Sequence, residues 1–359
     1  MMAALALTFA ACSNDDNDLA QQPAEQPANN EITITATVSS DDATTRALSI
    51  DGSNIASTWE ADDQFAILYN DGTSNVKRVA TVSSINGSTV TITFTIPSSL
   101  TNNTACKIVY PASAANAANT GADVATALAA QDGTIGNCPE VRVGTATIDK
   151  DNHSLSNVKK LVAQNAIFKF TTKNANGSAP INVKPLTVTI GAQNYVITPA
   201  LATSELYVAL PAVSDQAVRF SATDSDSKTY TCSKASVTFA AGKYYQSTLK
   251  MAPPITVTWN NNDITGSGNS FSKGGVTLTA GSIDFDEKNF EENGTFTTTL
   301  GNFTKIEVVA TNGFCDVAGT GWSGNSDKRT WTGNASSVSF IGDIYGDGNG
   351  IKFVFTIEP

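Results

Sequence analysis

Histidine is the first residue to look for in a search for catalytic chemistry, and this chain has only one, His153. Imidazole is the usual proton carrier of hydrolytic sites and a common ligand of transition metals. One histidine rules out His-rich zinc sites and leaves any Ser-His-Asp or Cys-His arrangement a single base. His153 stands in a polar stretch, residues 149–156, which predicts an exposed loop.

Carboxylates offer a second route to catalysis, because a glycosidase needs only two acids. The acids between Asp284 and Glu292 are expected to form a solvated face. Asp343, Asp347 and Asn349 stand among glycines, but their spacing does not match an EF-hand loop, and calcium needs six or more oxygen ligands. Neither a GxSxG nor a P-loop pattern occurs. We therefore expect no enzyme, no resident metal and no cofactor.

The C-terminal third is rich in aromatic residues and glycine, which suggests a binding surface. Trp322, Trp331 and Tyr345, together with Phe314, are candidates for a platform that stacks on sugar rings. Large aromatic side chains are also common core residues of β-sandwiches, and packing in the core is the favoured alternative.

Composition indicates a β-rich and acidic chain. The 359 residues carry a net charge of -11, and no Lys/Arg cluster offsets it, so nucleic-acid binding is not expected. Only 15% of residues are charged, and Thr, Ser and Asn supply much of the polar surface. These residue types are typical of strands and turns.

The N-terminus has the pattern of an export signal. Residues 1–11 are mostly apolar and too few to span a bilayer, which takes about 20. The basic region of a signal peptide is missing, so we expect the true start upstream. The sequence from Leu7 to Cys12 resembles a bacterial lipobox, in which Cys12 carries the lipid. The acidic patch at residues 13–18 resembles the surface-export signal of Bacteroidetes lipoproteins. Residues 13–30 are predicted to form a flexible tether.

Four further cysteines follow, without any CxxC spacing that would indicate a zinc site. Export permits disulfides, and Cys106 with Cys138 is the pair to test first because both fall in the same predicted domain. Four buried free thiols are the equal alternative, and they would include Cys232 and Cys315.

Period-two alternation of apolar and polar residues dominates the chain and predicts strands with one buried face. The clearest example is residues 31–38, where Ile32, Ile34, Ala36 and Val38 face one way. Similar patterns occur in residues 89–96, 186–190, 206–210, 255–259 and 351–357. Many short strands separated by turns indicate an all-β fold of tandem sandwiches. One short helix is expected within residues 122–130 of the first domain.

The chain divides into three predicted β-sandwich domains. The first spans residues 31–154 and the second residues 155–250. The consecutive prolines at residues 253 and 254 mark a linker, because proline cannot join a central strand. Residues 255–359 form the third domain, a candidate binding domain.

Several motifs resemble, in order and spacing, the fimbrillin family of Bacteroidetes, the subunit lipoproteins of type V pili. They are the strand at residues 31–38, then Thr45-Arg46-Ala47, the run from Thr58 to Ala66, and Lys107 to Pro111. Residues 161–170 and 241–245 resemble the opening and the end of the family's second domain. The resemblance covers roughly residues 31–250.

The resemblance implies two transthyretin-like β-sandwich domains and assembly by strand exchange. In the polymerising members, a protease cuts after an arginine behind the first strand, and a strand of another subunit fills the groove that is left. Arg46, followed by Ala47, matches the cleavage position, and Ile32, Ile34, Ala36 and Val38 would belong to the replaceable strand. An ordinary surface arginine in a turn is the equal alternative for Arg46.

The third domain departs from a plain two-domain subunit, because it places the last strand inside its own fold. This favours a tip or accessory fimbrial subunit in adhesion at the outer membrane. Its partners would be other fimbrial subunits and a glycan or protein receptor on a host or bacterial surface. The alternative is a monomeric glycan-binding lipoprotein at the cell surface.

Overall fold

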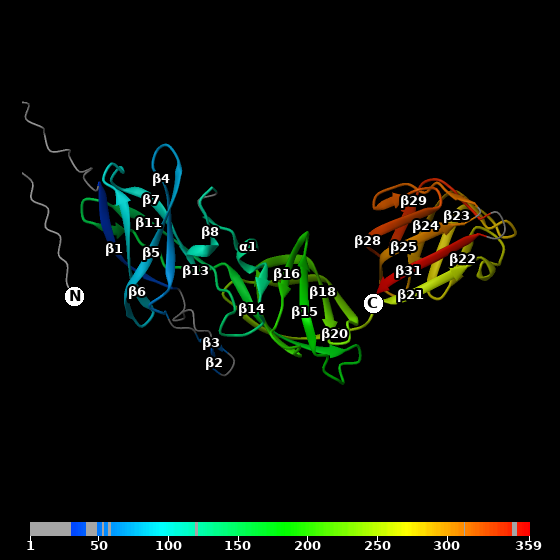
Figure 1. The fold of residues 1–359 in the computed structure, drawn as a ribbon, viewed down its shortest axis with the longest axis horizontal. Coiled ribbons are helices and arrows are strands. Elements are labelled where there is room, and N and C mark those ends of the chain that lie inside the picture. Colours follow the sequence, from blue (N-terminus) through cyan, green and yellow to red (C-terminus); the bar gives the residue numbers. More distant parts are fainter. Residues whose placement is uncertain are drawn as a thin grey trace, which may run out of the picture.

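The computed structural model describes residues 30–40, 49–51, 54–56, 59–118, 121–311, 313–346 and 350–359. These residues form three β-rich domains that follow one another along the molecule, and the C-terminus lies at the junction of the second and third (Figure 1). The prediction of an all-β chain of tandem sandwiches is confirmed. The α-helix of the described part, α1 (Val124–Leu128), lies within the stretch where a short helix was expected.

The first domain is built on one sheet that curls around its core. Its strand order is β1-β6-β5-β4-β7-β11-β12, and β13 also pairs with β11. The strands are β1 (Glu31–Ser39), β4 (Gln64–Asn70), β5 (Asn75–Asn86), β6 (Thr89–Pro97), β7 (Thr104–Tyr110), β11 (Arg142–Asp149), β12 (Ser154–Ser156) and β13 (Val162–Ala163). A separate two-stranded hairpin, β2 (Ser49–Asp51) and β3 (Asn54–Ala56), follows β1 in the chain.

Residues between β7 and β11 leave this sheet and pack on the second domain. They form η1 (Ala112–Ala114), β8 (Ala115–Asn116), β9 (Gly121–Ala122), helix α1 and β10 (Ala130–Gln131). Strand β10 pairs in parallel with a strand of the second domain, and the buried amide of Gln131 bonds both the N–H and the carbonyl of Ala209 at 2.8 Å. Leu128 and Val141 share one apolar core with the second domain. This segment therefore packs on the second domain through Leu128, Gln131 and Val141.

The second domain is a sandwich of two sheets. One has the strand order β10-β16-β15-β18-β19 and the other β17-β14-β20. The strands are β14 (Asn165–Asn174), β15 (Val183–Ile190), β16 (Gln193–Ile197), β17 (Glu205–Pro211), β18 (Val213–Asp224), β19 (Thr229–Phe239) and β20 (Tyr244–Met251). The predicted strands around residues 186–190 and 206–210 are β15 and β17. Burial alternates along β15, whereas three consecutive residues of β17, 208–210, are all buried.

The third domain is also a two-sheet sandwich, with the orders β21-β31-β25-β28-β27 and β22-β23-β24-β30-β26. The first sheet contains β21 (Ile255–Asn260), β25 (Asn302–Ala310), β27 (Trp322–Gly324), β28 (Lys328–Ala335) and β31 (Ile351–Glu358). The second contains β22 (Ser270–Lys273), β23 (Val276–Asp284), β24 (Asn289–Thr298), β26 (Phe314–Cys315) and β30 (Ile344–Tyr345), while β29 (Ser337–Phe340) pairs with β24. The turn η2 (Asn261–Asp263) joins β21 to the second sheet. Rings of Trp259, Phe296 and Phe353 fill the space between the sheets.

An ion pair connects the second and third domains. The guanidinium of Arg219 on β18 donates two hydrogen bonds to the carboxylate of Glu358, the last residue of β31. Glu358 is buried, whereas Arg219 still reaches solvent. The last strand is thus held inside the third domain and against the second. None of the described helices has the length and apolar character needed to cross a bilayer.

Candidate functional site: the first strand and its groove

Strand β1 lies at one end of the strand order and pairs with β6 along its whole length. The antiparallel register runs from Glu31 opposite Pro97 to Ser39 opposite Thr89. Alternation along β1 produces a threonine face toward solvent and an apolar face toward the core. The sequence pattern therefore predicted both the strand and its orientation correctly.

The apolar face of β1 enters the core of the first domain. Ile34 and Val38 are 0% and 1% exposed, Ala36 is also buried, and Ile32 is partly buried against the same core. On β6, the side chains that face this core are Val90, Ile92, Phe94 and Ile96. If β1 left, the domain would expose an apolar groove with the unpaired backbone of β6 along one side.

The other edge of β1 makes only scattered contacts. The N–H of Thr35 donates to the carbonyl of His153 at 3.0 Å, and the N–H of Leu161 donates to Ser39 at 2.8 Å. An isolated parallel bridge joins Ser40 to Leu161. These bonds close the curled sheet, but they do not form a second ladder. Strand β1 is therefore held mainly from one side.

An aromatic cluster lies in the same core as the apolar face of β1. Trp59, Phe65 and Tyr110 lie with ring centroids 5.1–5.2 Å apart. The hydroxyl of Tyr110 donates to the buried carboxylate of Asp63 at 2.9 Å, and that carboxylate also accepts the N–H of Glu60 at 2.9 Å. Tertiary contact thus joins two of the sequence motifs, residues 58–66 and 107–111, which lie far apart in the chain. Sequence reasoning did not identify this bond, because no local pattern signals it.

The candidate lipidation residue Cys12, with Arg46 and Ala47 of the candidate cleavage position, lies outside the described residues. Arg46 belongs to the segment between β1 and β2. The four other arginines, Arg78, Arg142, Arg219 and Arg329, all lie in strands. Strands resist proteolysis better than connecting segments do.

The aromatic residues proposed for sugar binding do not form one platform. Trp322 and Trp331 are cross-strand partners on β27 and β28, and Trp331 is only 7% exposed. Their indole N–H groups donate to backbone carbonyls of Ser339 and Thr320, at 3.2 and 3.1 Å. Tyr345 lies on the other sheet. Trp331 is a core residue, as the favoured alternative predicted. Trp322 packs partly against the same core.

The four described cysteines follow one of the two alternatives that the sequence left open, that of buried free thiols. Cys106, Cys138, Cys232 and Cys315 are all free and buried. Cys106 lies in the core of the first domain, whereas Cys138 packs in the core shared with the second. The two cysteines fall in one predicted domain, but Cys138 lies in the segment after β7 that packs on the second domain. Burial raises the pKa of the Cys106 thiol to about 12.

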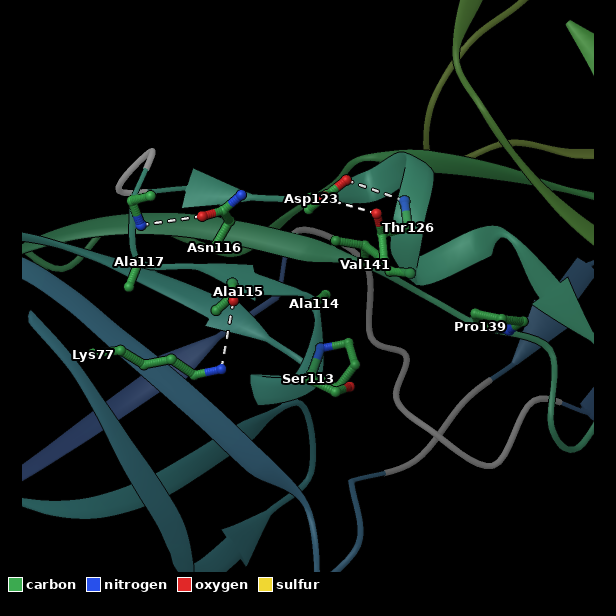
Figure 2. Close-up of a pocket in the computed structure, with 13 residues that line it drawn as sticks. Lys77, Ser113, Ala114, Ala115, Asn116, Ala117, Asp123, Thr126, Pro139 and Val141 are labelled. Atoms are coloured by element: carbon green, nitrogen blue, oxygen red, sulfur yellow. Dashed lines mark hydrogen bonds between the residues drawn. The ribbon is translucent and has the colours of Figure 1, made fainter. Parts of the chain in front are cut away.

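A cavity of about 670 Å³ opens between β5 and the alanine-rich segment 112–127 (Figure 2). Lys77 extends into it from β5 and donates to the carbonyls of Ala112 and Ala115, at 2.7 and 3.4 Å. Asp123 caps helix α1 by accepting bonds from Thr126 (Figure 2). The charged side chains of this cavity are therefore already hydrogen-bonded within the protein. Alanine side chains form much of the remaining wall. This lining lacks the convergent polar groups of a typical ligand site.

His153 lies on an exposed turn with a φ of 49°. Among the described residues, no three His, Cys, Asp or Glu side chains gather in a way that would hold a metal ion.

Comparisons with known proteins give structural likenesses only. No family model and no curated protein matches the sequence. A candidate cell adhesion protein from Bacteroides uniformis is 11% identical, with a TM-score of 0.33, over 63% of this chain and 94% of its own. A fimbrial assembly protein from Parabacteroides distasonis is 13% identical, with a TM-score of 0.33, over 61% and 90%. A fimbrial protein from Bacteroides ovatus is 12% identical, with a TM-score of 0.29, over 61% and 48%. With TM-scores below 0.5, these likenesses carry no argument about function.

Proposed function

We propose that this chain is a surface-anchored fimbrial subunit that acts in adhesion, not in catalysis, and that assembles by exchange of β1 for a strand of another subunit. The observation that carries the proposal is the position of β1. Among the described strands it is an edge strand that pairs with β6 alone. It inserts an apolar face into the core and precedes the segment that contains Arg46. The fimbrillin-like motifs support the same assignment.

The stabilisation that the first domain gains by burying β1 is compatible with such an exchange. Burying one large aliphatic side chain stabilises a fold by about 1.5–3 kcal/mol. The fully buried Ile34 and Val38, with smaller contributions from Ile32 and Ala36, therefore amount to about 4–7 kcal/mol. A domain is typically stable by only about 5–15 kcal/mol. Without β1, the first domain would be only marginally stable. Binding of an incoming strand with the same alternation would therefore be strongly favourable.

Strand exchange of this kind produces a fibre. The groove and the donated strand are different surfaces, so each contact is head-to-tail and the assembly does not close. In the present chain β31 is held between β21 and β25, and Glu358 binds Arg219. Donation by this C-terminal strand would break both contacts. We therefore propose a tip or accessory position, where the chain accepts a strand and does not donate its own last strand.

Digestion with an Arg-specific protease tests this proposal. We expect one fast cut, after Arg46, and oligomers afterwards in size-exclusion chromatography and on non-boiled gels when a donor subunit is present. Arg46→Gln should stay intact and monomeric under the same conditions. The matched control is Arg78→Gln, which removes an arginine of β5 and should leave the cut unchanged. A chain that is cut at Arg46 and yet remains monomeric with every pilus subunit tested contradicts a role in assembly.

A further inference from the structure

The outer face of the third domain carries a second feature, independent of β1. Residues 314–318 and 341–345 form a short antiparallel ladder, in which Phe314 pairs with Tyr345 and Cys315 with Ile344. The N–H of Asp316 donates to the carbonyl of Asp343 at 2.9 Å, and Ala318 exchanges two backbone bonds with Ile341. The register is the same along the whole ladder, and it determines which side chains face outward.

The inner face of this ladder packs in the core through Cys315, Val317 and Ile344. Alternation then places three cross-strand pairs on the outer face. We call this surface the outer ladder, and its residues are Phe314 with Tyr345, Asp316 with Asp343, and Ala318 with Ile341.

Apolar groups are unusually exposed on the outer ladder. Phe314 is 45% exposed and Ile341 68% exposed. The rings of Phe314 and Tyr345 stack with centroids 4.7 Å apart and an interplanar angle of 22°. Phe314 and Ile341 stand at the two ends of the outer ladder, with Asp316 and Asp343 between them. Stacking covers the facing sides of the two rings, so the π faces left for a partner are their outer faces.

Negative charge lies next to these rings. Asp316 and Asp343 are directly opposite each other, an arrangement that like charges make unfavourable. Arg329 relieves it only from one side, with its guanidinium 3.7 Å from the carboxylate of Asp316. Glu291 accepts the hydroxyl hydrogen bond of Tyr345, and this contact raises the pKa of the Tyr345 phenol. The nearby Lys288 directs its ammonium to the carbonyl of Phe285.

The outer ladder begins at the end of the molecule that lies away from the second domain. Strand β31 runs from Ile351 to Glu358, and Glu358 contacts the second domain (Figure 1). At the other end of β31, Ile351 pairs with Ala310, and the N–H of Thr311 donates to Gly350 at 2.7 Å. Phe314 comes three residues after Thr311 in the chain and so lies near this end of β31. The aromatic pair is therefore accessible to a partner that approaches the third domain from the side away from the second domain (Figure 1).

We propose that the outer ladder is a docking surface for a cationic segment of another protein, an extended peptide that bears arginine or lysine. The cation would lie over the Phe314–Tyr345 pair and between Asp316 and Asp343, while the stem of its side chain covers Ile341. A cation over an aromatic face is attracted by the ring and here also neutralises the opposed carboxylates. A neutral sugar would stack on the rings but add no positive charge beside Asp343, so charge favours the peptide.

Fluorescence anisotropy with labelled short peptides tests this assignment on the full chain carrying Cys12→Ser. An Arg-Gly repeat should bind saturably, more weakly at high salt, and a Glu-Gly repeat should not. Phe314→Ala and Asp343→Asn should each weaken binding about tenfold. Asp343→Asn keeps the oxygen that accepts the N–H of Glu292 at 2.9 Å, so the fold should survive.

Asp226→Asn, at an exposed turn of the second domain, is the matched control and should leave the affinity unchanged. Equal weakening by this control, or no saturable binding of the Arg-Gly peptide, would overturn the proposal. Binding of a labelled neutral oligosaccharide that Phe314→Ala abolishes and Asp343→Asn leaves intact would also overturn it, because the surface would then recognise sugar. Cleavage after Arg46 and oligomer formation do not enter this assay, so the two proposals fail separately.

Discussion

Replacement of Ile34 by alanine should destabilise the first domain strongly. Ile34 is completely buried in β1, and its ladder partner is Phe94 of β6. Loss of a large buried aliphatic side chain costs about 2–5 kcal/mol, the sum of lost transfer free energy and a cavity term. This is comparable with the whole stability of a marginal domain.

Thr35→Ala is the matched control, because Thr35 is the next residue along β1 and its side chain points to solvent. Its bond to His153 uses the backbone N–H, which alanine retains. We expect a change of about 0.5 kcal/mol or less. Urea denaturation measures the overall cost, and hydrogen–deuterium exchange of the β6 amides assigns it to the first domain. Equal effects of the two substitutions would refute the register and the groove inferred from it.

Three further predictions concern contacts away from β1. Tyr110→Phe removes the donor to the buried carboxylate of Asp63 and should cost about 1–3 kcal/mol in urea denaturation. Glu358→Ala should cost about 1–2 kcal/mol, less than for a fully buried pair because Arg219 reaches solvent, and should speed proteolysis in the linker at residues 252–254. In a Cys12→Ser chain at pH 8, Cys106 should react with a thiol reagent only after unfolding, because burial raises its pKa to about 12. Since its ordinary pKa of 9.0 is lower, stability should fall as the pH rises above about 9.

Strands with strict alternation were predictable from the sequence. Residues 31–38 and 351–357 formed the expected strands with the expected faces buried, because a period of two fixes both conformation and orientation. The same pattern does not say which strands become neighbours. The structure was needed to show that, within the described part of the chain, β1 pairs only with β6 and therefore lies at an edge.

The remaining features could not be predicted because they depend on tertiary contact. The alanine-rich segment 112–131 has no strong period, so its packing on the second domain carried no sequence signal. Trp331 and Phe314 are both aromatic residues near glycines, yet one is buried and the other exposed. The outer ladder rests on the two-residue strands β26 and β30, which are too short for any periodicity to reveal.

Capture of a free strand measures the exchangeability of β1 most directly. The chain is cut after Arg46 and incubated with an isotope-labelled peptide of residues 31–39, and native mass spectrometry then reports which strand is bound. We predict that the labelled peptide replaces β1 in the cut chain, that an uncut Arg46→Gln chain takes up none, and that a peptide with Ile34→Asp fails to bind. A cut chain that keeps its own β1 and excludes the labelled peptide would contradict strand exchange.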